Sequence, residues 1–494
     1  MTSTERAIAK LPGHLRRFVV SQSYEAYTPR DQAVWRHILH RLTDHLRDKA
    51  HPSYLEGLAA TGIGLERIPS LDEMNGKLEK LGWSAVAVRG FIPPAVFTEL
   101  QTLGVLAIAE DIRDHSHIAY TPAPDIVHES AGHAPILANA RYADYLKRCG
   151  QVGFKAIASL EDQEVFEAIR NLSVVKEDPT ASPEDVKAAE DRLAAAGRAR
   201  RFVSENTRAS RLYWWTAEYG LIGDLEHPRI YGAGLLSSLG EAEHCLTPAV
   251  KKLPLSLACA DTEYDITTMQ PQLFVARDFD HLFEVLDAFE ATLAWKRGGD
   301  FGLQEALRAR TVNHLVLSDG TEVTGIVDEL SALDEAHAPG LRTTLARLRG
   351  PILVSRNGRA QGAPFHGDAV VLIGDAVLHD PAFDFSEGGR VLVFRSAALP
   401  SVAGGPADPE AWDEAFGGLN TFAAGDGEAR ARAAKAQALK PEVARLYAEV
   451  RRQRESGRPD PATLSELAAA ARAFPDEWLL REELQELHAE PAHA

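Results

Sequence analysis

The 494-residue sequence has little cysteine, no excess of positive charge and no long apolar run. Its three cysteines, Cys149, Cys245 and Cys259, show no CxxC spacing, so neither a disulfide framework nor a zinc ribbon is expected, and a reducing, cytoplasmic setting is favoured. The formal net charge of −18 argues against nucleic acid or an anionic membrane as the main partner, because both need a basic patch. No run of about 18 apolar residues predicts a membrane-spanning helix. The N-terminal segment also lacks the apolar core of a signal peptide.

The chain is too long for one ordinary core, so we expect two or three domains. With 45% apolar and 25% charged residues, its composition is that of a globular protein. Apolar residues recur at helical spacing in the first part, and short strand patterns with glycine turns follow. We predict a mainly α domain with few short strands, a small β-rich module and a helical C-terminal tail, with the bounds 1–300, 301–405 and 406–494.

Local patterns predict individual elements. Thr28 begins a helix whose apolar residues recur at helical spacing. Ser70, with Glu73 three residues later, has the pattern of a capping box. Residues 84–93 predict a short strand that runs into a loop, and residues 94–112 predict one apolar-periodic helix.

Residues 160–210 are charged and rich in alanine, which predicts a helical insertion on the surface. Ser182 is the expected N-cap of one of its helices, and Gly197 is expected to follow that helix. The insertion is either a lid over a site or a solvated excursion without a role in chemistry.

Turn residues mark the predicted β-rich module and its end. The dipeptide Asp319-Gly320 predicts a hairpin. The stretch AGGPADPEAW, residues 403–412, predicts a linker. The helical tail beyond it could pack on the β-rich module.

The stretch YTPAPDIVHESAGHAPIL, residues 120–137, contains two histidines five residues apart, His128 and His133. Imidazole binds iron, zinc and copper, and two from one short segment form a local chelate. In an ideal helix five residues turn by roughly 140°, so both rings can face one ion only at a helix end or a local irregularity. Gly132 is a permissive place for such an irregularity. On spacing alone, two ordinary histidines are the alternative.

A third metal ligand must come from elsewhere in the chain. Glu218 lies among aromatic residues in LYWWTAEYGLIGD, residues 212–224. A carboxylate in such an apolar setting is costly unless it is paired or bound to a cation. Two histidines and one carboxylate on one face of a metal form the facial triad of non-haem Fe(II) oxygenases. An acid on a helix surface is the alternative for Glu218.

Four separated motifs resemble, in the same order, those of the pterin-dependent aromatic amino acid hydroxylases, the family that includes phenylalanine 4-hydroxylase. They are YTPAPDIVHESAGH (120–133), YWWTAEYGL (213–221), YGAGLLSSLGE (231–241) and LPLSLACADTEYDITTMQPQLFVARDF (253–279). The resemblance extends over about residues 27–295 and implies the mainly α catalytic domain of that family.

This resemblance also implies the chemistry. Fe(II) would be held by His128, His133 and Glu218. The implied reaction is the hydroxylation of an aromatic amino acid, with phenylalanine to tyrosine expected, by use of O2 and a tetrahydropterin such as tetrahydrobiopterin. The cofactors would carry the hard chemistry, while the protein places the reactants and excludes water.

The resemblance assigns four residues to the pterin. Phe97 matches the phenylalanine whose ring stacks on the cofactor, although by pattern alone it is a core aromatic residue. Gly90 and Ile92 match backbone contacts to the pterin. Glu129 matches an acid close to the pterin ring.

Five further residues match positions around the amino acid substrate. Arg113 matches the arginine that holds the substrate carboxylate, for which a bidentate guanidinium is well suited. Asp125 matches the acid that steadies this arginine; a surface ion pair is the alternative for both. Thr121 and Ser237 match other pocket positions, and Ser237 could also orient a ligand histidine. Trp214 matches an aromatic wall of the pocket.

Departures from the family leave the substrate and the activity open. The insertion lengthens the chain between His133 and Glu218. Ala107 and Leu273 stand where phenylalanine hydroxylases carry larger residues, so tryptophan or another aromatic compound is an alternative substrate. A non-catalytic relative that binds an aromatic ligand and a zinc hydrolase are two competing hypotheses for the activity. Residues 301–494 resemble no identified family and are candidates for self-association or for binding a protein partner.

Overall fold

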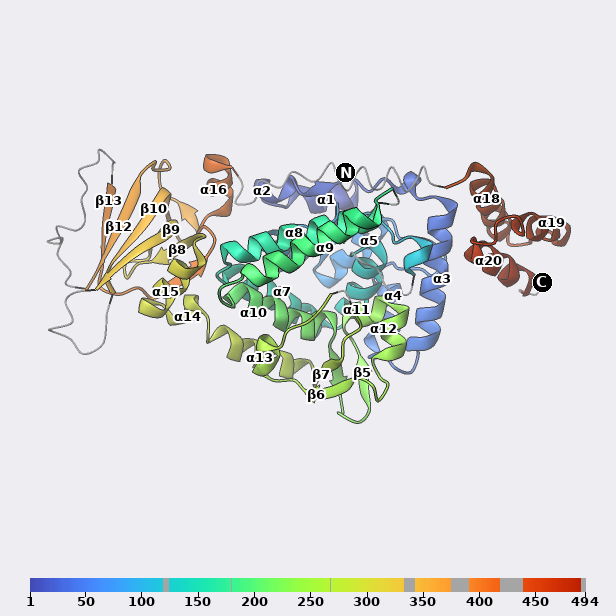
Figure 1. Ribbon diagram of the computed structural model, residues 1–494, viewed down its shortest axis with the longest axis horizontal. Coiled ribbons are helices and arrows are strands. Elements are labelled where there is room, and N and C mark those ends of the chain that lie inside the picture. The colour runs from blue at the N-terminus through green and yellow to red at the C-terminus, as the bar shows by residue number, and fades with distance from the viewer. Residues whose placement is uncertain are drawn as a thin grey trace.

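The structure is a computed structural model of the chain (Figure 1). It describes residues 1–118, 124–178, 180–266, 268–332, 343–374, 391–417 and 439–489. A helix-rich part comes first, a β-rich part follows, and three helices end the described chain. Figure 1 shows the β-rich part and the C-terminal helices at opposite ends of the helix-rich part. None of the helices in the described ranges combines the length and the apolar character needed to cross a membrane.

The helix-rich part is built around a large apolar core to which most of its helices contribute. The bounds of these helices are α1 Ser3–Ala9, α2 Gly13–Arg16, α3 Pro29–Leu46, α4 Ser53–Ala60, α5 Leu71–Leu78, α6 Pro94–Thr102, α7 Ala140–Lys155, α8 Leu160–Glu177, α9 Pro183–Ala199, α10 Glu205–Tyr213, α11 Ala233–Ser237, α12 Leu239–His244, α13 Phe279–Glu290, α14 Ala294–Arg297 and α15 Gly299–Ala309.

Two predicted helix starts differ in their capping. Helix α3 begins as predicted: the Thr28 hydroxyl accepts from the Asp31 N–H, and the Asp31 carboxylate accepts from the Thr28 N–H. Ser70 caps α5, but the predicted capping box is wrong. The Glu73 carboxylate accepts from Arg67, at 2.8 Å, and so turns away from the Ser70 N–H.

Two small sheets lie within the helix-rich part. Their strands are β1 Val19–Val20, β2 Ser84–Val88 and β3 Val105–Ala109 in one sheet, and β5 Pro228–Ile230, β4 Leu221–Gly223, β7 Gln272–Ala276 and β6 Lys251–Pro254, in that spatial order, in the other. The single helix predicted over residues 94–112 is therefore wrong, because α6 is followed by β3. Gly104, with φ 69°, turns the chain after the helix. The next residues, VLAIA, form a strand buried on both faces, which has no alternating pattern.

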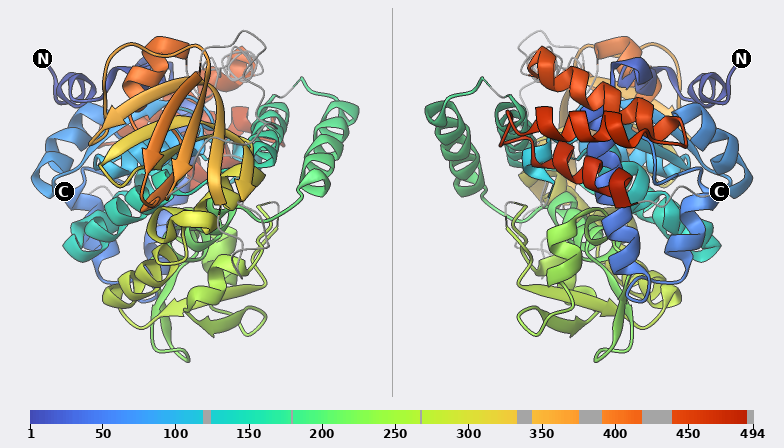
Figure 2. Two further views of the ribbon diagram at one scale, coloured as in Figure 1. Left: turned by 90° about the vertical axis from the view of Figure 1, so that its left-hand side faces the viewer. Right: turned by 90° about the vertical axis from the view of Figure 1, so that its right-hand side faces the viewer.

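The β-rich part is one sheet, seen from its side of the molecule in Figure 2. Its spatial order is β13-β12-β10-β9-β8-β14, and β11 pairs with β10. The hairpin predicted at Asp319-Gly320 is confirmed, since β8 and β9 pair antiparallel there and Gly320 has a φ of 84°. The bounds are β8 Val312–Val316, β9 Thr321–Ala332, β10 Thr343–Arg356, β11 Arg359–Ala360, β12 Asp368–Ile373, β13 Val391–Ser396 and β14 Ser401–Gly404.

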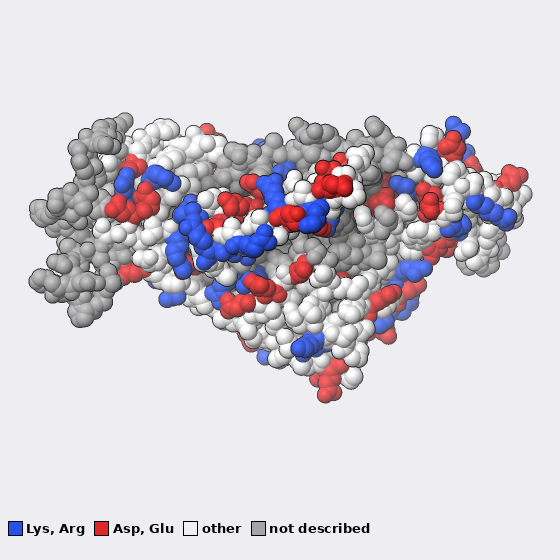
Figure 3. Space-filling view, viewed as in Figure 1, with Lys and Arg blue, Asp and Glu red and all other residues white. Residues whose placement is uncertain are grey.

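The predicted insertion forms α8, α9 and the start of α10. Helix α9 begins with Ser182 as its N-cap, as predicted, but it ends at Ala199, so that Gly197 lies inside it. Figure 2 shows α9 on the outside of the molecule. Acidic side chains lie in its first turn and basic side chains near its end, the arrangement that a helix dipole favours (Figure 3).

The segment predicted as a linker is structured. Residues 403–412 contain the end of β14 and the start of α16, Pro409–Phe416. The Asp408 carboxylate accepts from the Ala360 N–H at 2.9 Å, and the Glu410 carboxylate accepts from the Gly13 N–H at 2.8 Å. This segment therefore joins the large sheet to α2.

Three helices form the C-terminal tail: α18 Pro441–Glu455, α19 Pro461–Ala471 and α20 Trp478–Ala489. The tail packs on α3, where Tyr447 and Leu480 share the large core with Ile38. Figure 1 shows these helices beside α3 and far from the large sheet. The expectation that the tail packs on the β-rich module is therefore wrong.

Candidate metal centre

The two histidines and the carboxylate singled out in the sequence converge in space. His133 Nε2 lies 3.1 Å from Glu218 Oε1, and His128 Nε2 lies 3.3 Å from Glu218 Oε2. One potential ligand atom from each residue lies within 4.8 Å of the others. In the described part of the chain, no other group of three histidine, cysteine or acidic side chains has this spacing.

A π-helical turn, Val127–His133, brings the two histidines together. A π-helix bonds residue i to residue i+5, so residues five apart lie on the same side of the turn. The local irregularity predicted from the five-residue spacing is therefore confirmed. Gly132 contributes in another way than predicted. Its φ is not positive, but a Cβ at this position would lie 2.6 Å from the Ala233 carbonyl oxygen.

Glu218 ends a second π-helical turn, Trp214–Glu218, which follows α10. Its side chain is largely buried. Burial alone would raise the pKa of Glu218, but His133 and His128 together hold that pKa well below its usual range. Glu218 is thus an ionised carboxylate facing two imidazole nitrogens, which is the donor set of a facial triad.

Ser237 lies within hydrogen-bond distance of His128, where it could orient that ring. The Ser237 hydroxyl donates to the Ala233 carbonyl at 2.7 Å, so it can accept from Nδ1–H of His128 at 3.0 Å. With its proton on Nδ1, a neutral His128 has Nε2 free to bind a metal ion beside Glu218. The donors fit a divalent transition-metal ion such as Fe(II) or Zn(II).

Arg113 and Asp125 form a buried, bidentate ion pair beside the centre. Arg113 Nε and Nη2 each lie 2.8 Å from an Asp125 oxygen, and Nη1 donates to the Ser237 carbonyl at 3.0 Å. Burial alone would raise the pKa of Asp125. The Arg113 guanidinium lowers that pKa by more, so the pKa of Asp125 lies below its usual value. The side chain of Arg113 is 1% exposed, which excludes the alternative of a surface pair.

The four residues assigned to the pterin lie on two adjacent segments and on the first π-helical turn. Phe97, on α6, packs edge-to-face against Tyr213 at 5.7 Å, and Tyr213 directly precedes the turn that ends in Glu218. Ile92 is partly buried against the same apolar cluster as Phe97. Gly90 has a φ of 57°, which favours glycine. Burial raises the pKa of Glu129 to about 8.

Trp214 belongs to a group of three stacked rings. Its ring lies 4.5 Å from that of Tyr219 and 4.2 Å from that of Tyr264. The sequence alone assigns no role to Tyr264. Its aromatic ring, within one of the four motifs, is the only feature of the sequence that marks it. Thr121 lies outside the described residues.

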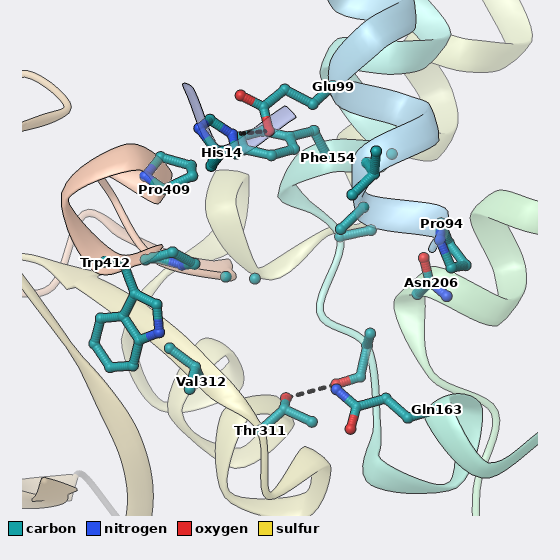
Figure 4. A pocket seen from close by; sticks show the side chains of 18 of the residues that line it. His14, Pro94, Glu99, Phe154, Gln163, Asn206, Thr311, Val312, Pro409 and Trp412 are labelled. Atoms are coloured by element: carbon teal, nitrogen blue, oxygen red, sulfur yellow. Dashed lines mark hydrogen bonds and ion pairs between the residues drawn. The ribbon is translucent and has the colours of Figure 1, made fainter. Parts of the chain in front are cut away.

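Ala107 and Leu273, which stand where phenylalanine hydroxylases carry larger residues, are both buried in strands. Ala107 lies in β3 and Leu273 in β7. A cavity of about 140 Å³ lies elsewhere, between α6, α7, the large sheet and α16 (Figure 4). Its lining includes His14 and Trp412 but none of the three candidate ligands.

Comparison with known proteins identifies several similar chains. Residues 20–170 and 193–330 match the family profile described as biopterin-dependent aromatic amino acid hydroxylase. The chain is 31% identical to phenylalanine-4-hydroxylase of Mesorhizobium japonicum over 302 residues, 60% of this chain and 91% of that protein. It is 30% identical to phenylalanine-4-hydroxylase of Chromobacterium violaceum over 270 residues, 54% of this chain and 76% of that protein. A crystal structure of the C. violaceum enzyme with bound iron(III) and 7,8-dihydrobiopterin is 28% identical, has a TM-score of 0.45, and aligns with 58% of this chain and 90% of that chain.

Proposed function

The chain belongs to the biopterin-dependent aromatic amino acid hydroxylases, and we propose that it hydroxylates the ring of phenylalanine to form tyrosine with Fe(II), O2 and a tetrahydropterin. The single observation that carries this proposal is the convergence of His128, His133 and Glu218 within 4.8 Å. The buried Arg113–Asp125 pair beside them argues against a non-catalytic relative, which has no need to keep a charged pair in its interior.

In this proposal His128, His133 and Glu218 would hold the metal ion through two imidazole nitrogens and one carboxylate. When bound, Fe(II) and the reduced pterin supply the electrons that activate O2 for attack on an aromatic ring. The protein's own contribution is placement. Ser237 keeps the ring of His128 in the orientation that directs Nε2 to the metal.

Phe97, Gly90, Ile92 and Glu129 are the proposed contacts of the tetrahydropterin. The ring of Phe97 provides an apolar stacking surface, and Gly90 lets the backbone approach the cofactor closely. With a raised pKa, Glu129 can donate a hydrogen bond to a ring nitrogen or oxygen of the pterin near neutral pH.

Arg113 is the proposed partner of the substrate carboxylate. Among the described residues, the side-chain bonds to Asp125 and Ser237 use three of the five N–H donors of Arg113, and the other two could bind the substrate. Asp125 keeps the guanidinium in place, and Thr121, Trp214 and Ser237 complete the proposed pocket.

We propose that the catalytic domain spans residues 1–300, including the insertion at about 160–210. Separate apolar cores support a division from the β-rich module of residues 301–405. The third proposed region, residues 406–494, contains α16 and the three helices of the tail. The apolar side of the tail is covered by α3, so self-association or a protein partner would involve the β-rich module. The three buried, unpaired cysteines support a cytoplasmic location.

An aerobic turnover assay tests the proposal. The protein, loaded with Fe(II), is mixed with a tetrahydropterin and with phenylalanine, tyrosine or tryptophan in turn, and O2 uptake and product mass are followed. We expect tyrosine from phenylalanine, loss of product in His128→Ala and normal product in His227→Ala, an exposed histidine away from the three ligands. Product from tryptophan alone would change the substrate. No O2 uptake with iron bound would contradict the proposal and favour the zinc hydrolase.

A further inference from the structure

One buried arginine links the C-terminal tail to the candidate substrate site. Arg30 lies in the first turn of α3, and its side chain is 10% exposed. Its Nη2 lies 3.3 Å from Asp114 Oδ2, and its Nη1 lies 3.6 Å from Glu477 Oε1. Asp114 directly follows Arg113, the proposed partner of the substrate carboxylate. Arg30 thus stands between the tail and the loop that carries Arg113.

Other contacts hold the tail in place independently of Arg30. Glu483 accepts from Arg36 Nε at 2.8 Å and from Arg36 Nη2 at 2.5 Å, and both side chains are almost fully buried. Glu482 lies 3.0 Å from His37 and 2.8 Å from Arg41. Glu477 is therefore presented to Arg30 by a packed element, not by a loose chain end.

Within the tail, Glu477 itself is held by a second group. The Tyr447 hydroxyl donates to Glu477 Oε2 at 3.2 Å, whereas Arg30 faces Oε1. The position of the carboxylate that reaches Arg30 is thus set by α18 as well as by the start of α20.

The loop of residues 110–114 is held on both sides of Asp114. The Tyr27 hydroxyl donates to the Glu110 carbonyl at 2.6 Å. Arg113 is fixed by Asp125 and by the Ser237 carbonyl. The Asp114 carboxylate faces Arg30 on one side and Nδ1 of His115, at 2.9 Å, on the other.

We propose that Glu477 and Arg30 are positioning residues for substrate binding: the tail fixes Arg30, and Arg30 fixes the backbone at Asp114 and so the direction of Arg113. This inference rests on the proposed function, in which Arg113 binds the carboxylate of the amino acid. The family profile ends at residue 330, so the support comes from a part of the chain that the profile does not match.

The proposal predicts an effect on binding rather than on chemistry. Without the Glu477 charge, Arg30 keeps only Asp114 of the two carboxylates that it contacts in the described part of the chain. It then gains rotational freedom, so the loop samples more orientations. Substrate binding then becomes weaker, whereas the ring chemistry at the metal is unchanged once the substrate is bound.

Steady-state kinetics of the full chain test this prediction with Glu477→Gln. We expect the KM for phenylalanine to rise about fivefold, and the kcat and the KM for the pterin to stay within about twofold of the original values. Glu477→Asp, which keeps the charge, should recover most of the loss. Glu482→Gln is the matched control, since it removes another carboxylate between the tail and α3 that does not reach the loop. It should leave the KM for phenylalanine unchanged.

Hydrogen exchange of the substrate-free protein tests the same link without any hydroxylation. Amides of residues 110–118 should exchange faster in Glu477→Gln than in Glu482→Gln, with unchanged exchange in α18–α20. Inactivity of the original protein toward phenylalanine would overturn the proposed function, and this measurement would still decide the link.

Two results would overturn the link: an unchanged KM and unchanged exchange in Glu477→Gln, or an equal rise of the KM in Glu482→Gln. If Glu477→Gln releases the tail, Asp114→Asn breaks the contact from the other end. That variant must then raise the KM while the tail stays packed, or the link is overturned.

Discussion

At the scale of single residues, Ser237 would decide which nitrogen of His128 faces the proposed metal ion. Its hydroxyl already donates to the Ala233 carbonyl, so it can only accept from the imidazole. We predict that Ser237→Ala lowers the Fe(II) affinity about 10- to 100-fold, the usual effect of losing such a supporting bond. Titration of the metal-free protein with Fe(II) under anaerobic conditions measures this affinity. Ser130→Ala is the control, because the Ser130 hydroxyl bonds to the Ile126 carbonyl in the same turn and not to a ligand ring. Equal affinities of the two variants would contradict this role of Ser237.

A second residue, Glu205, makes stability depend on pH. Its carboxylate is buried and accepts from the Ile157 N–H at 3.0 Å and the Ala294 N–H at 2.6 Å. Burial raises the pKa of Glu205 from 4.5 to about 7, although both N–H groups act in the opposite direction. Between these two values the folded protein binds a proton that the unfolded chain has lost. The free energy of unfolding therefore falls as the pH rises through this window, by about 3 kcal/mol from this group.

Urea unfolding at about pH 5 and about pH 8 measures this effect as a difference between variants. Glu205→Gln cannot titrate, so it should lose less stability than the original protein between the two pH values. Glu164→Gln, which changes an exposed acid on the neighbouring α8, should follow the original protein. Parallel curves for Glu205→Gln and the original protein would show that the pKa of Glu205 is not raised.

At the scale of elements, the proposed metal centre depends on the close packing of one π-helical turn against α11. Gly132 allows this approach, since a Cβ there would lie 2.6 Å from the Ala233 carbonyl oxygen and 3.2 Å from Ser237 Cβ. We predict that Gly132→Ala destabilises the fold by about 1–3 kcal/mol and weakens Fe(II) binding, because it moves His128 away from Ser237. The matched control is Gly197→Ala. That residue lies within α9 with nothing within 4 Å of a Cβ, so the change should stabilise by up to about 1 kcal/mol. Iron binding and thermal unfolding are measured for both variants. Normal iron binding in Gly132→Ala would contradict the packing argument.

The sequence predicts this turn only in part. The five-residue spacing of His128 and His133 requires an irregular helix, and the structure confirms one. The role of Gly132 in packing depends on a contact with Ala233, which is far away in the sequence. Sequence spacing carries no information about such a contact. Roles for Phe97 and Arg113 are implied only by the family resemblance, because single aromatic or basic residues occur in many settings.

The errors among the predicted elements have a common cause. VLAIA, residues 105–109, is buried on both faces and lacks alternation, so a strand there cannot be told from a helix by its pattern. Glu73 has the position of a capping-box residue, yet Arg67 competes for its carboxylate. In each case the decisive contact is tertiary, and local patterns cannot include it.

At the scale of the whole molecule, the C-terminal third contacts the helix-rich part at both ends. Gly404, at the end of β14, lies so close to the Ala156 carbonyl that a Cβ would be 2.4 Å from its oxygen. Helix α16 contacts α2 through Glu410, and the tail packs on α3. None of these contacts could be predicted from the sequence, because the partners are hundreds of residues apart and no motif marks them.

The tail contact makes the last prediction possible. Arg36 and Glu483 are 5% and 4% exposed, and Glu483 also faces Arg454, at 3.4 Å. Arg36→Ala leaves the Glu483 carboxylate buried and poorly compensated. We therefore expect a loss of about 3–5 kcal/mol in the free energy of opening α20, measured by native-state hydrogen exchange.

Arg41→Ala provides the comparison for this loss. Arg41, like Arg36, lies on α3, and it is an exposed partner of Glu482. Its loss should lower the free energy of opening α20 by no more than about 1 kcal/mol. The double change Arg36→Met with Glu483→Leu separates charge from packing, because apolar side chains of similar size often replace a buried ion pair without loss. If Arg36→Ala opened α20 no more easily than Arg41→Ala, the pair would not be buried in solution. The tail could then not hold Glu477 against Arg30, so this comparison also tests the physical basis of the proposed link to the substrate site.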